Sequence, residues 1–154
     1  MKTYNQFIEQ LAESLVLEDE IAKALKDKNS VDNRYRAALK AETTHHLDVM
    51  QKDRSSDVRA EVGRHPKATS SHIDKALEDK HPHVRLSAFD HNNPTIKSHH
   101  VEKGINDSDH MVRAAAIQHD AATHEHIKKA LGDSHPMVRK FAAAAAKKKG
   151  LKVE

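Results

Sequence analysis

One short motif recurs along most of this chain at intervals of 26 to 28 residues. Its most regular copy runs from His72 to Arg85. The copy contains a His, an apolar residue, an Asp six positions later and a Val-Arg pair that ends six residues after that Asp. The apolar residues at the start of the five copies are Ile21, Leu47, Ile73, Val101 and Ile127. A period in the range of about 20 to 50 residues is typical of a solenoid or array.

The composition favours short helices. The chain of 154 residues has four Gly, four Pro and only 3% aromatic residues, and the alternation of β-branched and polar residues that marks strands is missing. An elongated stack suits such a chain, because each unit buries only a thin interface of small apolar residues against its neighbours. We therefore expect one all-α domain, 1–154.

The period divides this domain into a capping segment and five units of two helices. An amphipathic helix with Phe7, Ile8, Leu11 and Leu15 on one stripe is expected to cap the stack over residues 1–18. Gln51 departs from the apolar residue found at its position in other units, and we expect Met50 to substitute. The predicted repeats span residues 19–42, 43–66, 67–93, 94–120 and 121–150.

The first helix of a unit is expected to begin after a Thr. Thr43, Thr69 and Thr123 stand three residues before a recurring His, which is the spacing between an N-cap and the third helical residue. Pro82 and Pro136 stand where a proline is tolerated, in the first turn of the second helix.

The spacing Asp-x5-Arg within paired short helices resembles the HEAT repeat. The wording V-R-x5-H-x-P-x-T is also similar to the leucine-rich-repeat variant (LRV), which usually has Asn-Pro where this chain has His65-Pro66. The resemblance covers residues 19–149 and implies a right-handed α-solenoid (superhelix) of about five HEAT-like repeats. It also implies a ladder of hydrogen bonds between a turn Asp and a second-helix Arg. The ladder residues are Asp53, Arg59, Asp79, Arg85, Asp107, Arg113, Asp133 and Arg139.

The arginine column has two interpretations. Arginines spaced along a groove can neutralise a phosphate backbone. Each of these arginines, however, has an Asp at a fixed spacing, which favours charge-assisted pairs that fix the register of neighbouring repeats. We favour the structural ladder.

The chain has fourteen histidines, and seven of them fall in two columns. One column stands at the third position of the first helices, and the other, with His65, His91 and His119, lies six residues after an arginine of the Val-Arg pairs. Zinc needs ligand nitrogens about 2.0 to 2.1 Å away, so histidines of successive repeats cannot easily share an ion. We therefore expect structural or surface histidines, no metal site and no cofactor, although repeat duplication alone leaves a pH-dependent role open.

Sequence signatures of catalysis are not found. The chain has no G-x-S-x-G, H-E-x-x-H or phosphate-binding glycine loop, and it has no cysteine. It has no apolar run of the roughly 18 residues that a membrane span needs. We therefore expect a soluble cytoplasmic protein that is not an enzyme.

Charge is distributed unevenly along the chain. Residues 1–20 carry five acidic side chains against Lys2, whereas residues 139–154 carry six basic side chains against Glu154. Solvated caps that match the helix dipoles would account for this difference. The alternative is head-to-tail self-association, in which the acidic end of one copy binds the basic end of another.

The second helices usually line the concave side of such a solenoid. Side chains there that the core does not need are expected to form a binding groove of mixed charge, which suits a protein partner better than nucleic acid. The first hypothesis is a protein-binding scaffold, adaptor or inhibitor, and the alternative is a nucleic-acid binder that uses the Lys/Arg/His-rich surface. The candidate groove residues are Glu61, Arg64, Leu86, Ser87, Phe89, Asp90, Gln118 and Lys140.

Overall fold

The structure is a computed structural model that describes residues 4–90 and 94–151. Within these ranges it contains helices and no strands, so the expectation of an all-α chain is confirmed. The helices are α1 (Tyr4–Leu25), α2 (Val31–Ala38), α3 (Thr44–Met50), α4 (Ser56–Arg64), α5 (Ser70–Leu77), α6 (Pro82–Ser87), α7 (Ser98–Ile105), α8 (His110–Gln118), α9 (His124–Leu131) and α10 (Pro136–Lys148).

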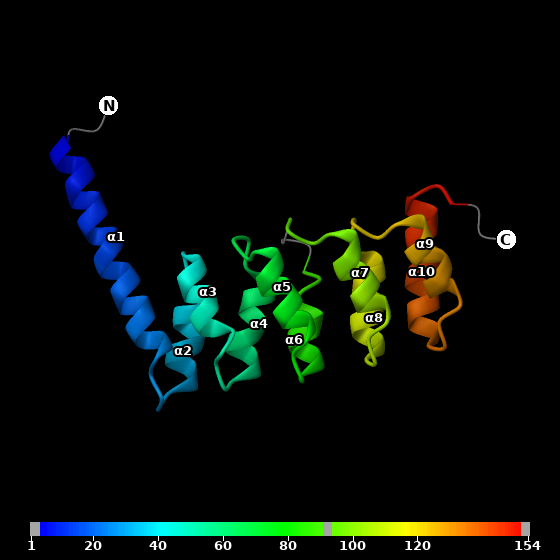
Figure 1. Cartoon of the computed structure of the whole chain (residues 1–154), viewed down its shortest axis with the longest axis horizontal. Helices are drawn as coiled ribbons and strands as arrows, with labels where there is room; N and C mark the ends of the chain where they lie inside the picture. Colours follow the sequence, from blue (N-terminus) through cyan, green and yellow to red (C-terminus); the bar gives the residue numbers. More distant parts are fainter. Residues whose placement is uncertain (1–3, 91–93, 152–154) are drawn as a thin grey trace.

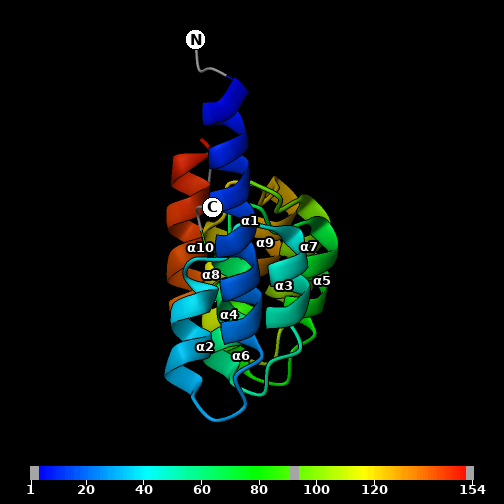
Figure 2. The same cartoon turned by 90° about the vertical axis from the view of Figure 1, so that its left-hand side faces the viewer.

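Successive helix pairs stand side by side in an elongated row (Figure 1). We number the pairs unit 1 (α1 and α2) to unit 5 (α9 and α10). Each helix packs mainly against helices of its own unit or of the next one. The view along the row shows two layers, with α3, α5, α7 and α9 in one and the second helices in the other (Figure 2). The handedness of the array and the assignment of each pair as a repeat remain predictions.

The core is a continuous strip of small side chains between these layers. The recurring apolar residue of the first helix is at most 3% exposed in every unit, and the Val before the arginine is at most 1% exposed in units 2 to 5. Alanines such as Ala114 and Ala142 complete the strip from the second helices. Small side chains are enough to fill this core, because the layer of first helices packs only against the layer of second helices.

The helices begin where the sequence predicts. The hydroxyls of Thr43, Thr69 and Thr123 each accept a hydrogen bond from the backbone N–H three residues later, as expected for N-caps. Pro82 and Pro136 occupy the first position of their helices. Met50 is fully buried, so it does fill the core beside the polar Gln51.

Residues 4–18 do not form a separate capping helix, and residues 1–3 of the expected cap lie outside the described part. α1 continues without a break from Tyr4 to Leu25, so the expected boundary after residue 18 lies inside it. Among the described side chains of α1, the buried ones are Ile21 and Leu25 near its end. The expected apolar stripe is in water, since Ile8, Leu11 and Leu15 are 42 to 57% exposed, and the side chain of Phe7 lies outside the described part.

Candidate functional site

Arginine–aspartate pairs join successive units. Arg59, Arg85 and Arg113 each donate through Nε to one carboxylate oxygen of the next unit's turn Asp over 2.6 to 2.8 Å. They donate through Nη2 to the other oxygen over 2.8 to 3.0 Å. Each Nη1 also donates to the carbonyl of the turn Asp of its own unit, over 2.8 to 3.0 Å. The partners are Asp79, Asp107 and Asp133.

The first rung uses an arginine that the sequence reading missed. Arg34 places its Nε 2.7 Å from Asp53. Arg34 lies seven residues after Asp27, whereas later units have six, so the fixed spacing hid it. Its Nη1 donates to the Asp27 carbonyl over 2.7 Å, whereas its buried Nη2 has no partner.

The pKa values of the acids that pair with Arg59, Arg85 and Arg113 are lowered. The hydrogen bond from Arg113 lowers the pKa of Asp133. Burial is the largest influence on Asp79 and Asp107 and raises their pKa, but hydrogen bonds from arginine and backbone N–H groups, with the arginine charge, bring the pKa below its usual value. The folded state therefore favours the ionised acids. That contribution to stability is complete above the unfolded pKa of about 3.9 and is lost as the pH falls below it.

A second ladder, made of histidines and acids, runs along the first helices. Its histidines stand at the third position of these helices and are called the column histidines below. They are each at most 7% exposed: His46, His72, His100 and His126. The Nδ1 atom of each accepts a hydrogen bond from a backbone N–H just before its helix, with an N···N distance of 2.9 to 3.2 Å. In three of them Nε2 lies 3.2 to 3.5 Å from an acid of the preceding unit. The pairs are His72 with Asp48, His100 with Asp74 and His126 with Glu102, whereas His46 faces the carbonyl of Glu18 at 3.3 Å.

The same contacts decide whether these histidines could hold a metal ion. Asp74, His99 and His100 have candidate ligand atoms within 4.8 Å of one another. Because Nδ1 of His100 accepts the N–H of Lys97 over 2.9 Å, the neutral ring carries its proton on Nε2, the atom that faces Asp74. A metal on Nε2 would move that proton to Nδ1 and break the backbone bond. We therefore interpret the cluster as a rung, and the absence of a metal site remains a prediction.

The second histidine column also serves the backbone. His65 places Nε2 2.8 Å from the carbonyl of Ala41 in the preceding unit, and its Nδ1 accepts the N–H of Lys67. His119 is buried, and its Nδ1 accepts the N–H of Ala121. His91 lies outside the described residues.

Some of the expected groove residues line a hollow of about 460 Å³ on the second helices of units 1 to 3. Arg64 lies between two acids, 2.8 Å from Glu61 and 4.0 Å from Asp90. Apolar Val31 and Tyr35 complete this hollow, which we call the second-helix groove. It is lined by Val31, Asp32, Tyr35, Asp57, Glu61, Arg64 and His83.

Two expected groove residues are buried instead. Ser87 is 3% exposed and donates its hydroxyl hydrogen to the carbonyl of Val84 over 2.7 Å. Phe89 is 3% exposed, and its ring lies where a side chain on Gly104 would stand. Both side chains point toward a neighbouring unit. The position of a residue in the motif does not predict this direction.

The other expected groove residues lie nearer the surface. Leu86 is half-buried against the core, and Gln118 and Lys140 are exposed. The amide of Gln118 donates to the carbonyl of Ala114 over 3.0 Å. None of these three lines the second-helix groove.

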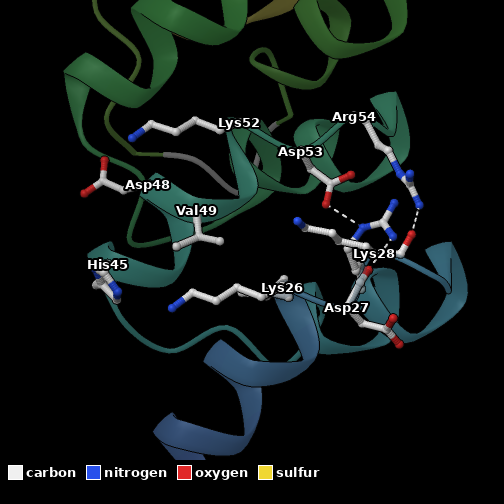
Figure 3. Close-up of a pocket in the computed structure, with 11 residues that line it drawn as sticks. Lys26, Asp27, Lys28, His45, Asp48, Val49, Lys52, Asp53 and Arg54 are labelled. Carbon is white, nitrogen blue, oxygen red and sulfur yellow. Dashed lines mark hydrogen bonds and ion pairs between the residues drawn. The ribbon is translucent and has the colours of Figure 1, made fainter.

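A larger cavity of about 820 Å³ opens between units 1 and 2. Figure 3 shows Lys26 and Lys52 on one side of it, beside His45 and Asp48. Arg34 also lines this cavity, although its unpartnered Nη2 is buried. We call this hollow the basic cavity, because its exposed cations are Lys26, Lys28, Lys52 and Arg54.

Residues 99–118 match the family described as HEAT repeat associated with sister chromatid cohesion. The match covers all of α8 and all but the first residue of α7, a single unit of the row. Comparisons with curated proteins and with solved structures find no match. The resemblance to the LRV repeat stays a prediction. No helix in the described ranges is long and apolar enough to cross a membrane.

Proposed function

We propose that this chain is a non-catalytic protein-binding scaffold, an adaptor or inhibitor built as a right-handed solenoid of HEAT-like repeats. The observation that carries the proposal is the second-helix groove, where exposed apolar side chains stand beside charges of both signs. The HEAT-like match of residues 99–118 supports it, because stacked helical repeats present extended surfaces to partners.

The chemistry of the groove favours a protein partner. Val31 and Tyr35 are 42% and 36% exposed and offer apolar area at one end. Asp57 and His83 add polar groups, with Asp57 Oδ1 3.8 Å from His83 Nε2. Tyrosine and arginine are enriched among the residues that dominate binding energy, and alternating charges select one partner over another.

The test is a quantitative affinity capture from native cells, with the captured proteins identified by mass spectrometry. A Val31→Ser, Tyr35→Ala variant removes the exposed apolar anchors without touching the core. Lys75→Glu, on the opposite layer, is the matched control. A specific partner should bind the groove variant at least about tenfold more weakly and the control normally. Equal capture by all three proteins would rule out the groove.

A second candidate function is binding of a nucleic-acid backbone in the basic cavity. Its four exposed cations support an anionic ligand. Gel shifts with duplex and single-stranded nucleic acid at two salt concentrations would test it. Binding should weaken steeply with salt and fall in a Lys26→Glu, Lys52→Glu variant, but not in Lys75→Glu. A salt-independent result, or no shift, would exclude it.

A further inference from the structure

The arginine ladder is incomplete at its C-terminal end. Arg139 is held as the other rung arginines are, with Nη1 donating to the carbonyls of Asp133 and Ser134 over 2.7 and 2.9 Å. In other units this anchoring directs Nε to the acid of the following unit. Among the described residues, no carboxylate meets Arg139. Its exposed side chain is therefore a donor already fixed in the geometry of a rung.

The N-terminal end has the complementary half. Asp27 accepts the N–H of Asn29 on Oδ1 over 2.8 Å, as Asp79 accepts that of His81 over 2.9 Å. Its carboxylate is thus held in the same turn as the acids of complete rungs. Within residues 4–90 and 94–151 it accepts a side-chain hydrogen bond from Asn33 and none from an arginine.

The histidine ladder ends in charges of opposite sign. In units 2 to 4, the acid of a rung stands two residues after the column histidine. At that position unit 5 has Lys128, which is exposed. In unit 1 the histidine position is taken by Glu20, also exposed. A rung formed between unit 5 and unit 1 would therefore pair a lysine with a glutamate.

Burial shows that both ends are uncovered interfaces. The residue four positions after the rung arginine is buried in units 1 to 4 and exposed in unit 5, at Ala143. At the other end, seven of the nine exposed large apolar side chains of the described residues lie on α1 and α2, and an eighth, Leu39, is the C-cap of α2. The outer face of a terminal capping repeat is normally polar. The α1 and α2 end is therefore not built as a cap.

We propose that copies of this chain associate head to tail, with unit 5 of one copy against unit 1 of the next. Arg139 of one copy then pairs with Asp27 of the next, and Lys128 pairs with Glu20. A second copy is the favoured occupant because both ends match it in charge, rung by rung. Figure 1 shows units 1 and 5 at opposite ends of the row, so the contact is heterologous and can propagate. The four charged residues of this contact do not line the second-helix groove, so the charge variants test the association separately from the groove.

Sedimentation velocity across a range of protein and salt concentrations is the first experiment. The average mass should grow with protein concentration and fall with added salt, because the paired charges are exposed before they meet. A protein that stays monomeric up to about 1 mM, where even a contact with a Kd of about 1 mM would be half formed, overturns the proposal.

A charge exchange tests the lysine–glutamate rung without risk to the core. Lys128→Glu and Glu20→Lys should each weaken the association constant about tenfold or more, and the chain that carries both substitutions should regain most of it. Circular dichroism of each variant checks that the fold is intact. If the double variant associates no better than the single ones, this pairing is wrong.

Mixing distinguishes a head-to-tail contact from a symmetric dimer. Arg139→Ala removes the donor of one end, and Asp27→Asn keeps the turn at the other end but loses the charge. Each variant alone should remain largely monomeric, and an equimolar mixture should form heterodimers and no longer chains. If each variant still forms dimers by itself, the interface is symmetric and the proposal fails.

Discussion

Replacing Arg85 by Met separates the energy of an inter-unit rung from that of an ordinary surface arginine. Arg85 makes two bonds to Asp107, at 2.7 and 2.8 Å, and one to the Asp79 carbonyl at 2.9 Å. The side chains of the ion pair are only 13% and 9% exposed. Met keeps the aliphatic stem but leaves a poorly hydrated carboxylate behind. Removing one partner of a buried ion pair lowers the free energy of unfolding by about 3 to 5 kcal/mol. Because this pair is partly hydrated, we expect a loss of about 3 kcal/mol.

Arg139→Met is the matched control. It removes the same side chain from an arginine that bonds only backbone carbonyls and is exposed, so the expected cost is about 1 kcal/mol or less. Urea unfolding followed by circular dichroism, at concentrations too low for association, measures both variants. With an m-value of about 2 kcal/mol/M, Arg85→Met should lower the midpoint by about 1.5 M. Equal midpoints for the two variants would show that the rungs do not stabilise the array.

Three further substitutions and one control test the core and the histidine layer. Gly104→Ala should cost about 1 to 3 kcal/mol in urea unfolding, because the new Cβ would stand 2.2 Å from the ring of Phe89. Gly132→Ala, whose Cβ meets nothing closer than 3.6 Å, should be neutral or slightly stabilising, and a similar loss in both would refute the packing argument. Gln51→Leu removes a buried, unpartnered amide oxygen and should raise the thermal midpoint or leave it unchanged; a clear drop would mean that the bond to the next unit dominates. Burial, followed by the charge of a neighbouring histidine, lowers the pKa of His100, so stability should fall as the pH drops below about 6.5, by at most about 1.4 kcal/mol per pH unit. His100→Gln should flatten that slope in unfolding measured from pH 7.5 to 5.5, and an unchanged slope would exclude this histidine.

The sequence was sufficient to predict helices in pairs, because one period aligned all the relevant signals. Thr69 marks a helix start and Pro82 the next, and the apolar Ile73 between them recurs every 26 to 28 residues. Each of these features acts within a few residues of chain, so local chemistry determines it. The all-helical structure follows from them.

Contacts between units were harder to predict, since they depend on which way a side chain points. Ser87 ends α6 and Phe89 lies just beyond it, and both face a neighbouring unit and are buried. The acids of the histidine rungs were missed although a signal was present, because His-x-Asp or His-x-Glu recurs in units 2 to 4. The continuity of α1 could not be deduced from the period, because a helix that extends beyond its unit needs no partner in the repeat.

Both ladders have a direction, and that direction bears on the ends of the row. Every arginine rung runs from a second helix to the turn of the following unit, and every histidine rung runs from an acid to the following unit's histidine. An array with a direction leaves an unused donor at one end and an unused acceptor at the other. Duplication of the repeat is therefore enough to explain the presence of Arg139 and Asp27. Lys128 and Glu20 are different, because each departs from its own column. Lys128 also lies 3.5 Å from Glu125 of its own helix, but an exposed pair of this kind contributes little and does not account for the charge of Glu20. Their opposite signs are expected if the two ends meet, which makes the charge exchange at this rung the experiment that separates adaptation from remnant.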